Sequence, residues 1–452
     1  MNDATDIFQG RSVPATIAKF AIPTILSQLV TLLYNLADTF FVGHTNDPAQ
    51  VAALTLSFPI FMSLTMVGNL FGIGANSFIS RSLGRKEREK ASLSSTFAFY
   101  GAMFGVVIII AVLHTFMKPI LYVIGAVTDA AFLATKQYLT WTVLYGGIPT
   151  VAALMLGHLI RAEGNTKQAS IGMALGGFLN IILDWVFVSR MGYGAEGAAR
   201  ATFLSNIASF LYLFCMIHRN KNTVIVLNPL KFRITEQISK QVILVGIPAA
   251  AVIILGSSAN ILLTHFMSAY GDVSIAGFGI VQKVGTIGIQ ITIGLTQGIM
   301  PLLGFCCGAN NISRMKEISK CSFIILGCYA ALCIILVEVF ATPVISLFTS
   351  DPKIIETGVK FVRIWFLCAP GMCFTNLFCS IFQAMGKWVQ SLSLSVIRQL
   401  GLLFPLLIIL NMIGGEMGLV CAQPLSDSIT LVIGFVLYHI SMKRYEEKFG
   451  TK

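Results

Sequence analysis

The chain of 452 residues is too apolar for a water-soluble protein. Hydrophobic residues make up 56% of it, charged residues only 11%, and the mean hydropathy is +0.80, whereas a soluble domain carries about 25% charged residues. The net charge of +11 would suit nucleic acid, but basic loops of a membrane protein explain it better, and we expect no nucleic-acid partner.

The first apolar run covers roughly residues 15–42 and follows a polar start of 14 residues. It is too long for the apolar part of a signal peptide, so we expect it to be the first membrane-spanning helix. Near its end, in YNLADTFFVG, it contains Asp38. An ionised Asp at mid-bilayer costs about 2.5–3.5 kcal/mol on insertion scales, which makes this carboxylate a candidate functional group.

Eleven further apolar runs follow at intervals of about 35–40 residues, as one helix of 20–30 residues and a short loop would give. The twelve runs are centred near Leu29, Thr65, Gly105, Thr150, Asn180, Ser209, Ile253, Gln290, Cys328, Phe374, Leu402 and Ile429. No run resembles a barrel strand. The predicted fold class is an all-α polytopic membrane protein with twelve transmembrane helices.

Lysine and arginine gather in alternate loops. They occur in RSLGRKEREK after the second run, in residues 219–233 after the sixth, in residues 314–320 after the eighth, and in residues 443–448 of the tail. The positive-inside rule places such loops in the cytoplasm. An even number of helices separates them, so we expect a multi-pass protein of the plasma membrane with both termini cytoplasmic.

The second half of the chain repeats the first. An Ile-Pro pair recurs 225 residues apart, Gly74 and Gly84 fall on Gly298 and Gly308 at a shift of 224, and AEGNTKQAS falls on AMGKWVQS at a shift of 222. We therefore predict two six-helix bundles, residues 1–220 and 241–452, joined by a basic cytoplasmic linker, residues 221–240. Their pseudo-twofold axis must follow the membrane normal, as in alternating-access transporters.

Acids within the amino-terminal spans have no counterpart in the other half. Asp38 aligns near Leu263, and Asp184 aligns near Leu406. If these acids only held helices together, a symmetric scaffold would be expected to keep them in both halves. Their presence in one half alone favours a functional site.

The spacing of polar residues supports an ion site. Asn180 and Asp184 are four residues apart and share one helix face, as do Ala198 and Thr202 on the sixth helix. The side chains of Asp38, Asn180, Asp184 and Thr202 all supply oxygen, the ligand atom that hard cations such as Na⁺ prefer. Two carboxylates in one dry pocket cannot both stay ionised cheaply, so one could carry a proton. The alternative is that Asp184 only bonds a neighbouring helix while Asp38 lies at a wet helix end.

The chain resembles multidrug and toxic compound extrusion (MATE) transporters over nearly its whole length. The likeness is carried by LADTFFVGH in the first helix, RSLGRKE after the second, RAEGNTKQA before the fifth, N-x₃-D in the fifth and GAEGAARAT at the start of the sixth. It implies V-shaped lobes and a monomeric antiporter, not an enzyme, that exports amphipathic, often cationic drugs in exchange for Na⁺ or H⁺, without another cofactor.

The resemblance also implies which residues couple the ion. The Asp of helix 1, the Asn and Asp of helix 5 and the Thr of helix 6 in prokaryotic members fall on Asp38, Asn180, Asp184 and Thr202, and a helix-4 Tyr falls on Tyr138. Another branch of the family couples through acids on helices 7 and 10, where this sequence has none. This departure favours coupling in the amino-terminal lobe and leaves the choice between Na⁺ and H⁺ open. The alternative function is a lipid-linked saccharide flippase of the wider superfamily.

Other membrane-buried residues suggest a charge network and a substrate cavity. Intramembrane charges usually pair, so we expect Asp427 to neutralise Arg398, Lys283 or both. Five apolar or aromatic residues occupy helix positions suited to a drug cavity, namely Phe58, Met62, Met66, Tyr145 and Met155. A membrane-embedded enzyme is the other alternative, but the sequence contains no HExxH, GxSxG or paired catalytic Asp motif.

Overall fold

The structure, a computed structural model, describes residues 12–45 and 47–449, and every regular element in these ranges is a helix. The first half contains α2 (Val13–Gly43), α3 (Pro48–Gly84), α4 (Arg88–Thr115), α5 (Met117–Val123), α6 (Asp129–Leu139), η1 (Thr140–Tyr145), α7 (Gly147–Ala162), α8 (Thr166–Asp184), η2 (Trp185–Arg190) and α9 (Gly194–Arg219). The second half contains η3 (Pro229–Lys231), α10 (Glu236–Ser268), α11 (Asp272–Gly308), α12 (Ile312–Ser346), α13 (Pro352–Phe366), α14 (Ala369–Ala384), α15 (Trp388–Val396), η4 (Ile397–Leu403) and α16 (Phe404–Phe449).

The described helices make twelve membrane spans. Nine are long and apolar enough to cross a membrane, and the bent pairs α6–α7 and α13–α14 bring the number to eleven. The run Trp388–Phe449 has 62 residues and would be about 93 Å long as one helix, three times the ~30 Å hydrocarbon core. Gly415 divides it, with φ 58° and ψ −137°, a conformation that glycine adopts readily. The predicted twelve-helix, all-α fold and its multi-pass membrane location are confirmed.

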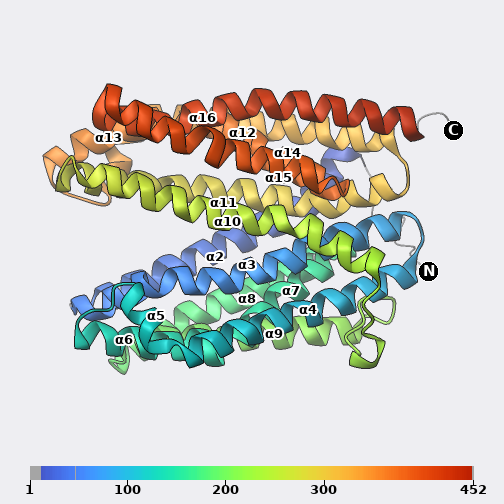
Figure 1. The fold of residues 1–452 in the computed structure, drawn as a ribbon, viewed down its shortest axis with the longest axis horizontal. Coiled ribbons are helices and arrows are strands. Elements are labelled where there is room, and N and C mark those ends of the chain that lie inside the picture. Colours follow the sequence, from blue (N-terminus) through green and yellow to red (C-terminus); the bar gives the residue numbers. More distant parts are fainter. Residues whose placement is uncertain (1–11, 46, 450–452) are drawn as a thin grey trace.

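The two halves of the chain form two bundles side by side. Figure 1 shows α2–α9 on one side and α10–α16 on the other, with the helices along the long axis. The fourth and tenth spans are bent alike, by 50° between α6–η1 and α7 and by 44° between α13 and α14. The internal repeat of the sequence is therefore also a repeat of helix shape.

Glycines bring the two bundles into backbone contact along a seam, which we define as Gly74, Gly84, Gly246, Gly298 and Gly308. A Cβ on Gly246 of α10 would lie 1.7 Å from the Leu70 carbonyl oxygen of α3, and one on Gly298 of α11 would lie 2.8 Å from the Ala21 Cα of α2. Helices α3 and α11 both end at this seam, next to the linker between the bundles. Small residues allow such close helix packing in membranes.

Gly246→Ala is expected to destabilise the folded protein by about 2–3 kcal/mol, because the new methyl group meets a backbone oxygen that cannot rotate away. Gly256→Ala on the same helix is the matched control, because a Cβ there meets nothing within 4 Å. Alanine is the better helix former, so the control should be stabilised by up to about 1 kcal/mol. Thermal unfolding of both purified variants tests this, and a lower melting temperature for the control alone would contradict it.

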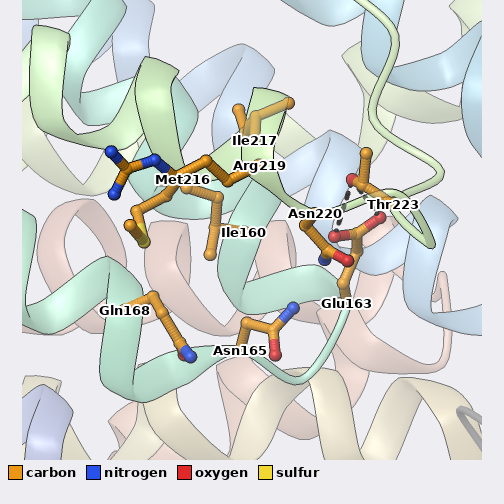
Figure 2. Close-up of a pocket in the computed structure, with 9 residues that line it drawn as sticks. All are labelled: Ile160, Glu163, Asn165, Gln168, Met216, Ile217, Arg219, Asn220 and Thr223. Carbon is orange, nitrogen blue, oxygen red and sulfur yellow. Dashed lines mark hydrogen bonds between the residues drawn. The ribbon is translucent and has the colours of Figure 1, made fainter.

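The start of the linker is anchored on the first bundle. The Glu163 carboxylate accepts hydrogen bonds from the Thr223 hydroxyl at 2.8 and 2.9 Å, as Figure 2 shows, and from the Val224 N–H. Farther along, Ser95 of α4 accepts from the Val226 N–H at 3.0 Å. Burial raises the pKa of Glu163, and the hydrogen bonds from Thr223 and the linker backbone act against that rise. Residues 223–226 are thus held against the first bundle.

Glu163→Ala is expected to release this anchor. Hydrogen bonds to a charged group contribute about 1.5–3 kcal/mol each, and 1.4 kcal/mol is tenfold in the open population, so trypsin should cut after Lys221 at least ~10-fold faster. Gln168→Ala is the control, because Gln168 lines the same pocket and, among the residues that the structure describes, makes no hydrogen bond to the linker. Equal cleavage of the Glu163 variant and the wild type would show that the anchor lies elsewhere.

Candidate ion-coupling site and central cavity

The polar residues predicted to couple an ion come together where α2, α8 and α9 meet. With the Asn180 amide oriented to satisfy both of its polar atoms, its nitrogen donates to Asp38 Oδ1 at 3.1 Å and its oxygen accepts from the Thr202 N–H at 3.2 Å. The Asp184 carboxyl lies within hydrogen-bonding reach of the Asp38 carboxyl. Asp184 is 0% exposed and Asp38 7%, so both acids are shielded from water.

Glycines of α8 make this meeting possible. A Cβ on Gly177 would lie 2.6 Å from the Val30 side chain of α2, and one on Gly176 would lie 2.0 Å from the Ser209 hydroxyl of α9. Helix α8 can therefore approach both neighbours closely, and the last turn of α8 then carries Asn180 and Asp184 to the end of α2.

A protonated or cation-bound state satisfies this cluster chemically. Two carboxyl groups can hydrogen-bond to each other only if one of them holds a proton. The Asp184 Oδ1 atom is buried and has no hydrogen-bond partner among the described residues. A buried, unpaired oxygen is costly, and either a proton or a small cation with oxygen ligands would remove that cost. The residues present therefore fit both H⁺ and Na⁺.

The other predicted site residues border the cluster. Tyr138, at the end of α6, lies near enough to both carboxyl groups to interact with them electrostatically. Ala198 is 0% exposed and belongs to an apolar cluster with Val42 and Val188, against which Tyr138 packs.

Two features of the site were missed by sequence reasoning. Tyr34 interacts electrostatically with Asp38 and also lines the central cavity; its signal is the four-residue spacing from Asp38. The π-helix η2 begins at Trp185, directly after Asp184, and η1 begins directly after the helix that carries Tyr138. Single π-turns occur often at functional sites, but their position cannot be read from the sequence.

A cavity of about 480 Å³ lies between the two bundles. Its wall includes Tyr34 and Met62 from the first bundle and Gln290 and Asn376 from the second. Gln28 of α2 donates a hydrogen bond to Gln297 of α11 at 3.1 Å across the cavity wall. The volume lies in the range of small-molecule pockets, about 300–1,000 Å³.

Only one of the five expected cavity residues lines this cavity in the part of the chain that the structure describes. Met62 is on the wall. Met155 is instead fully buried in the core, Phe58 and Tyr145 are each 56% exposed on the bundle surface, and Met66 is half-buried off the wall. Apolar residues face lipid, core and cavity alike, so helix position alone could not separate these environments.

The expected charge network forms without one of its members. Arg398 Nε lies 2.5 Å from Asp427 Oδ1, and Gln423 donates to Asp427 Oδ2 at 2.8 Å. Lys283 is a correction: it is exposed and makes no ion pair within the described ranges. Lys283 also does not line the central cavity, whose wall on α11 begins with Gln290, seven residues farther along the helix.

The sequence of each bundle matches the same family model. The model, described as MatE, matches residues 23–186 and again residues 248–409. The chain belongs to the MatE family. The predicted family membership is thus confirmed, and the two matches agree with the internal repeat of this MatE protein.

Known relatives and solved structures resemble this MatE protein along their whole lengths. "Multidrug export protein MepA" of Staphylococcus aureus is 29% identical over 97% of this chain and 96% of its own, and MepA of Staphylococcus saprophyticus is 28% identical over the same shares. A structure described as the "outward-facing conformation of a multidrug resistance MATE family transporter" superimposes with a TM-score of 0.92 at 22% identity, covering 99% of both chains. A transporter from Pyrococcus furiosus, described as having a binding pocket of reverse polarity, gives 0.91 at 22% identity, with 99% of each chain covered.

Proposed function

We propose that this MatE protein is a secondary active exporter of amphipathic compounds, driven by Na⁺ or H⁺ that enters through the Asp38 cluster. The observation that carries the proposal is the position of Tyr34, which lines the central cavity and lies one helical turn before Asp38 on α2. Substrate and ion would therefore act on the same segment of α2. The multidrug export named for the MepA relatives supports the same function.

Helix α2 is the element through which the two sites would be coupled. It carries Asp38, lines the cavity with Gln28 and Tyr34, and contacts the seam at Ala21. It also contains Pro23, which frees a backbone carbonyl and allows a kink. Two structures with this fold are described as MATE "in the bent conformation" and MATE "in the straight conformation". We infer that ion binding at Asp38 shifts α2 between two such shapes, which changes the cavity and the seam together.

The contact between the bundles at the seam determines to which side of the membrane the cavity is closed. The bundles touch through Gly84 and Gly308 at the linker end, and the cavity lies beyond this contact. With the termini in the cytoplasm of a plasma-membrane monomer, this arrangement would be closed to the cytoplasm. One charge that moves down 100 mV releases about 2.3 kcal/mol, enough for a concentration ratio of about 50-fold.

Dye movement in proteoliposomes tests the proposal. The wild-type protein is supplied with a Na⁺ gradient or an H⁺ gradient, and rhodamine 123 and carboxyfluorescein, which share a xanthene core, are followed in parallel. Gradient-driven movement of either dye is the expected result, and the effective gradient identifies the ion. Movement of neither dye under either gradient would overturn the proposal, and a lipid-linked saccharide flipping assay would then test the alternative function.

A further inference from the structure

The wall of the central cavity carries positive charge and no negative charge. Among the described residues that line it are two arginines, Arg161 and Arg398, and no aspartate or glutamate. The resemblance to MATE transporters implies substrates that are often cationic, yet this wall offers a cation no carboxylate. The rest of the wall combines apolar side chains such as Phe61 and Met173 with amides such as Asn206.

Arg398 is compensated within the second bundle. Its Nε and Nη2 atoms lie 2.5 and 3.3 Å from the two carboxylate oxygens of Asp427, which is itself 0% exposed. Such a two-point pair satisfies both charges. Arg398 therefore contributes hydrogen-bonding surface to the cavity but little net charge.

Arg161, at the end of α7, is not compensated. It is 2% exposed, its Nε has no hydrogen-bond partner, and it makes no ion pair in the part of the chain that the structure describes. The nearest acid in sequence, Glu163, is occupied by Thr223 and Val224 of the linker. Buried charges are normally paired, so Arg161 lacks a partner that a ligand in the cavity could supply.

The internal repeat shows that this charge is particular to one half. A shift of 222 residues places Arg161 on Gln383, which also lines the cavity. Gln383 donates to the Ser391 hydroxyl at 3.3 Å. In the second bundle this position therefore holds a neutral amide. Folding of the first bundle should not by itself require a guanidinium at the equivalent position.

We propose, on the basis of the export function proposed above, that the central cavity selects amphipathic molecules that carry an acidic group, and that Arg161 is the residue that binds this group. A carboxylate, sulfonate or phosphate would accept hydrogen bonds from the guanidinium and neutralise it. The apolar residues and amides of the wall would hold the remainder of the molecule. Arg161 is a specificity-determining residue in this proposal.

Equilibrium binding of two dyes of opposite charge tests the proposal. Fluorescence polarisation with the purified protein should show that carboxyfluorescein binds at least 10-fold more tightly than rhodamine 123. Arg161→Gln should weaken carboxyfluorescein binding at least 10-fold and leave rhodamine 123 binding unchanged or stronger, which also shows that the variant is folded. Arg161→Lys should retain most of the carboxyfluorescein affinity. Lys283→Gln removes a cation from a membrane helix away from the cavity wall and should change neither dye.

Other results of the binding and transport experiments show whether the acidic-group inference, the proposed export function or both are wrong. Preferential binding and gradient-driven movement of rhodamine 123 would overturn the inference and leave the export function in place. Undiminished carboxyfluorescein binding by Arg161→Gln would equally overturn it. Movement of neither dye would overturn both. Displacement of carboxyfluorescein by a polyprenyl phosphate, but not by naphthalene sulfonate, would support the acidic-group site and identify its source as a lipid head group.

Discussion

Asp38→Asn is expected to abolish gradient-driven export while the protein still folds. Asparagine keeps the size of the side chain and can still interact with the Asn180 amide, which now lies 3.1 Å from Asp38 Oδ1. It cannot release a proton or provide the negative charge that holds a cation. Substituting a residue that only supports the ligands of a metal ion typically lowers metal affinity or activity by about 10–100-fold, so loss of a direct ligand should lower the export rate by more than about 100-fold. The measurement is the initial rate of dye export in proteoliposomes under the gradient that drives the wild type.

Two comparisons make this result specific to the ion cluster. Asp129→Asn removes an exposed acid in the first turn of α6 and should export at the wild-type rate. Dye binding to Asp38→Asn at equilibrium should persist, because Asp38 is not on the cavity wall. Wild-type export by Asp38→Asn would show that the carboxylate is structural and that the coupling ion enters elsewhere.

The residues of the ion cluster could be predicted from the sequence, because helix spacing and the absence of equivalent acids in the other half both indicated them. The four-residue spacing of Asn180 and Asp184 fixes their common face, and Asp38 had no counterpart in the other half. The structure brings these residues and Thr202 together. What the sequence could not supply is the glycine contacts that press α8 against α2, or the π-turn that follows Asp184.

The cavity was poorly predicted because its wall has no distinctive residue type. Met62 and Met155 have the same chemistry, yet one lines the cavity and the other is fully buried. Arg161 was missed because it stands at the end of a span, where arginine is ordinary. Its comparison with Gln383 in the repeat was the available signal. Helix rotation is set by packing between distant segments and leaves no local trace in the sequence.

The glycines that revealed the internal repeat also lie at the interface between the two bundles. Gly74 and Gly84 align with Gly298 and Gly308, and all four lie on the seam. Because the repeated glycines of α3 and α11 meet the opposite bundle, the symmetry of the sequence is the symmetry of the interface. A pseudo-twofold contact of this kind can open on one side only if the bundles move as units, as alternating access requires.

Asp427→Ala is expected to destabilise the folded protein by about 3–5 kcal/mol, the cost of leaving a buried charge without its partner. Asp427 accepts from Arg398 and from Gln423 and is 0% exposed, so its loss leaves a guanidinium in the second bundle with no carboxylate. Thermal unfolding in detergent and the yield of folded protein measure the effect. The ion cluster lies in the other bundle, so any variant that folds should retain the ion dependence of export.

The double variant Arg398→Leu, Asp427→Ala distinguishes a charge pair from simple packing. Replacing both members of a buried pair with apolar residues is often neutral or stabilising, so the double variant should recover most of the stability that Asp427→Ala loses. If the two losses instead add, Asp427 is needed for its shape or for Gln423 rather than for Arg398. Recovery would mean that the Arg398 charge is neutralised within the bundle, which leaves Arg161, among the described residues of the wall, as the cation that the cavity presents to a substrate.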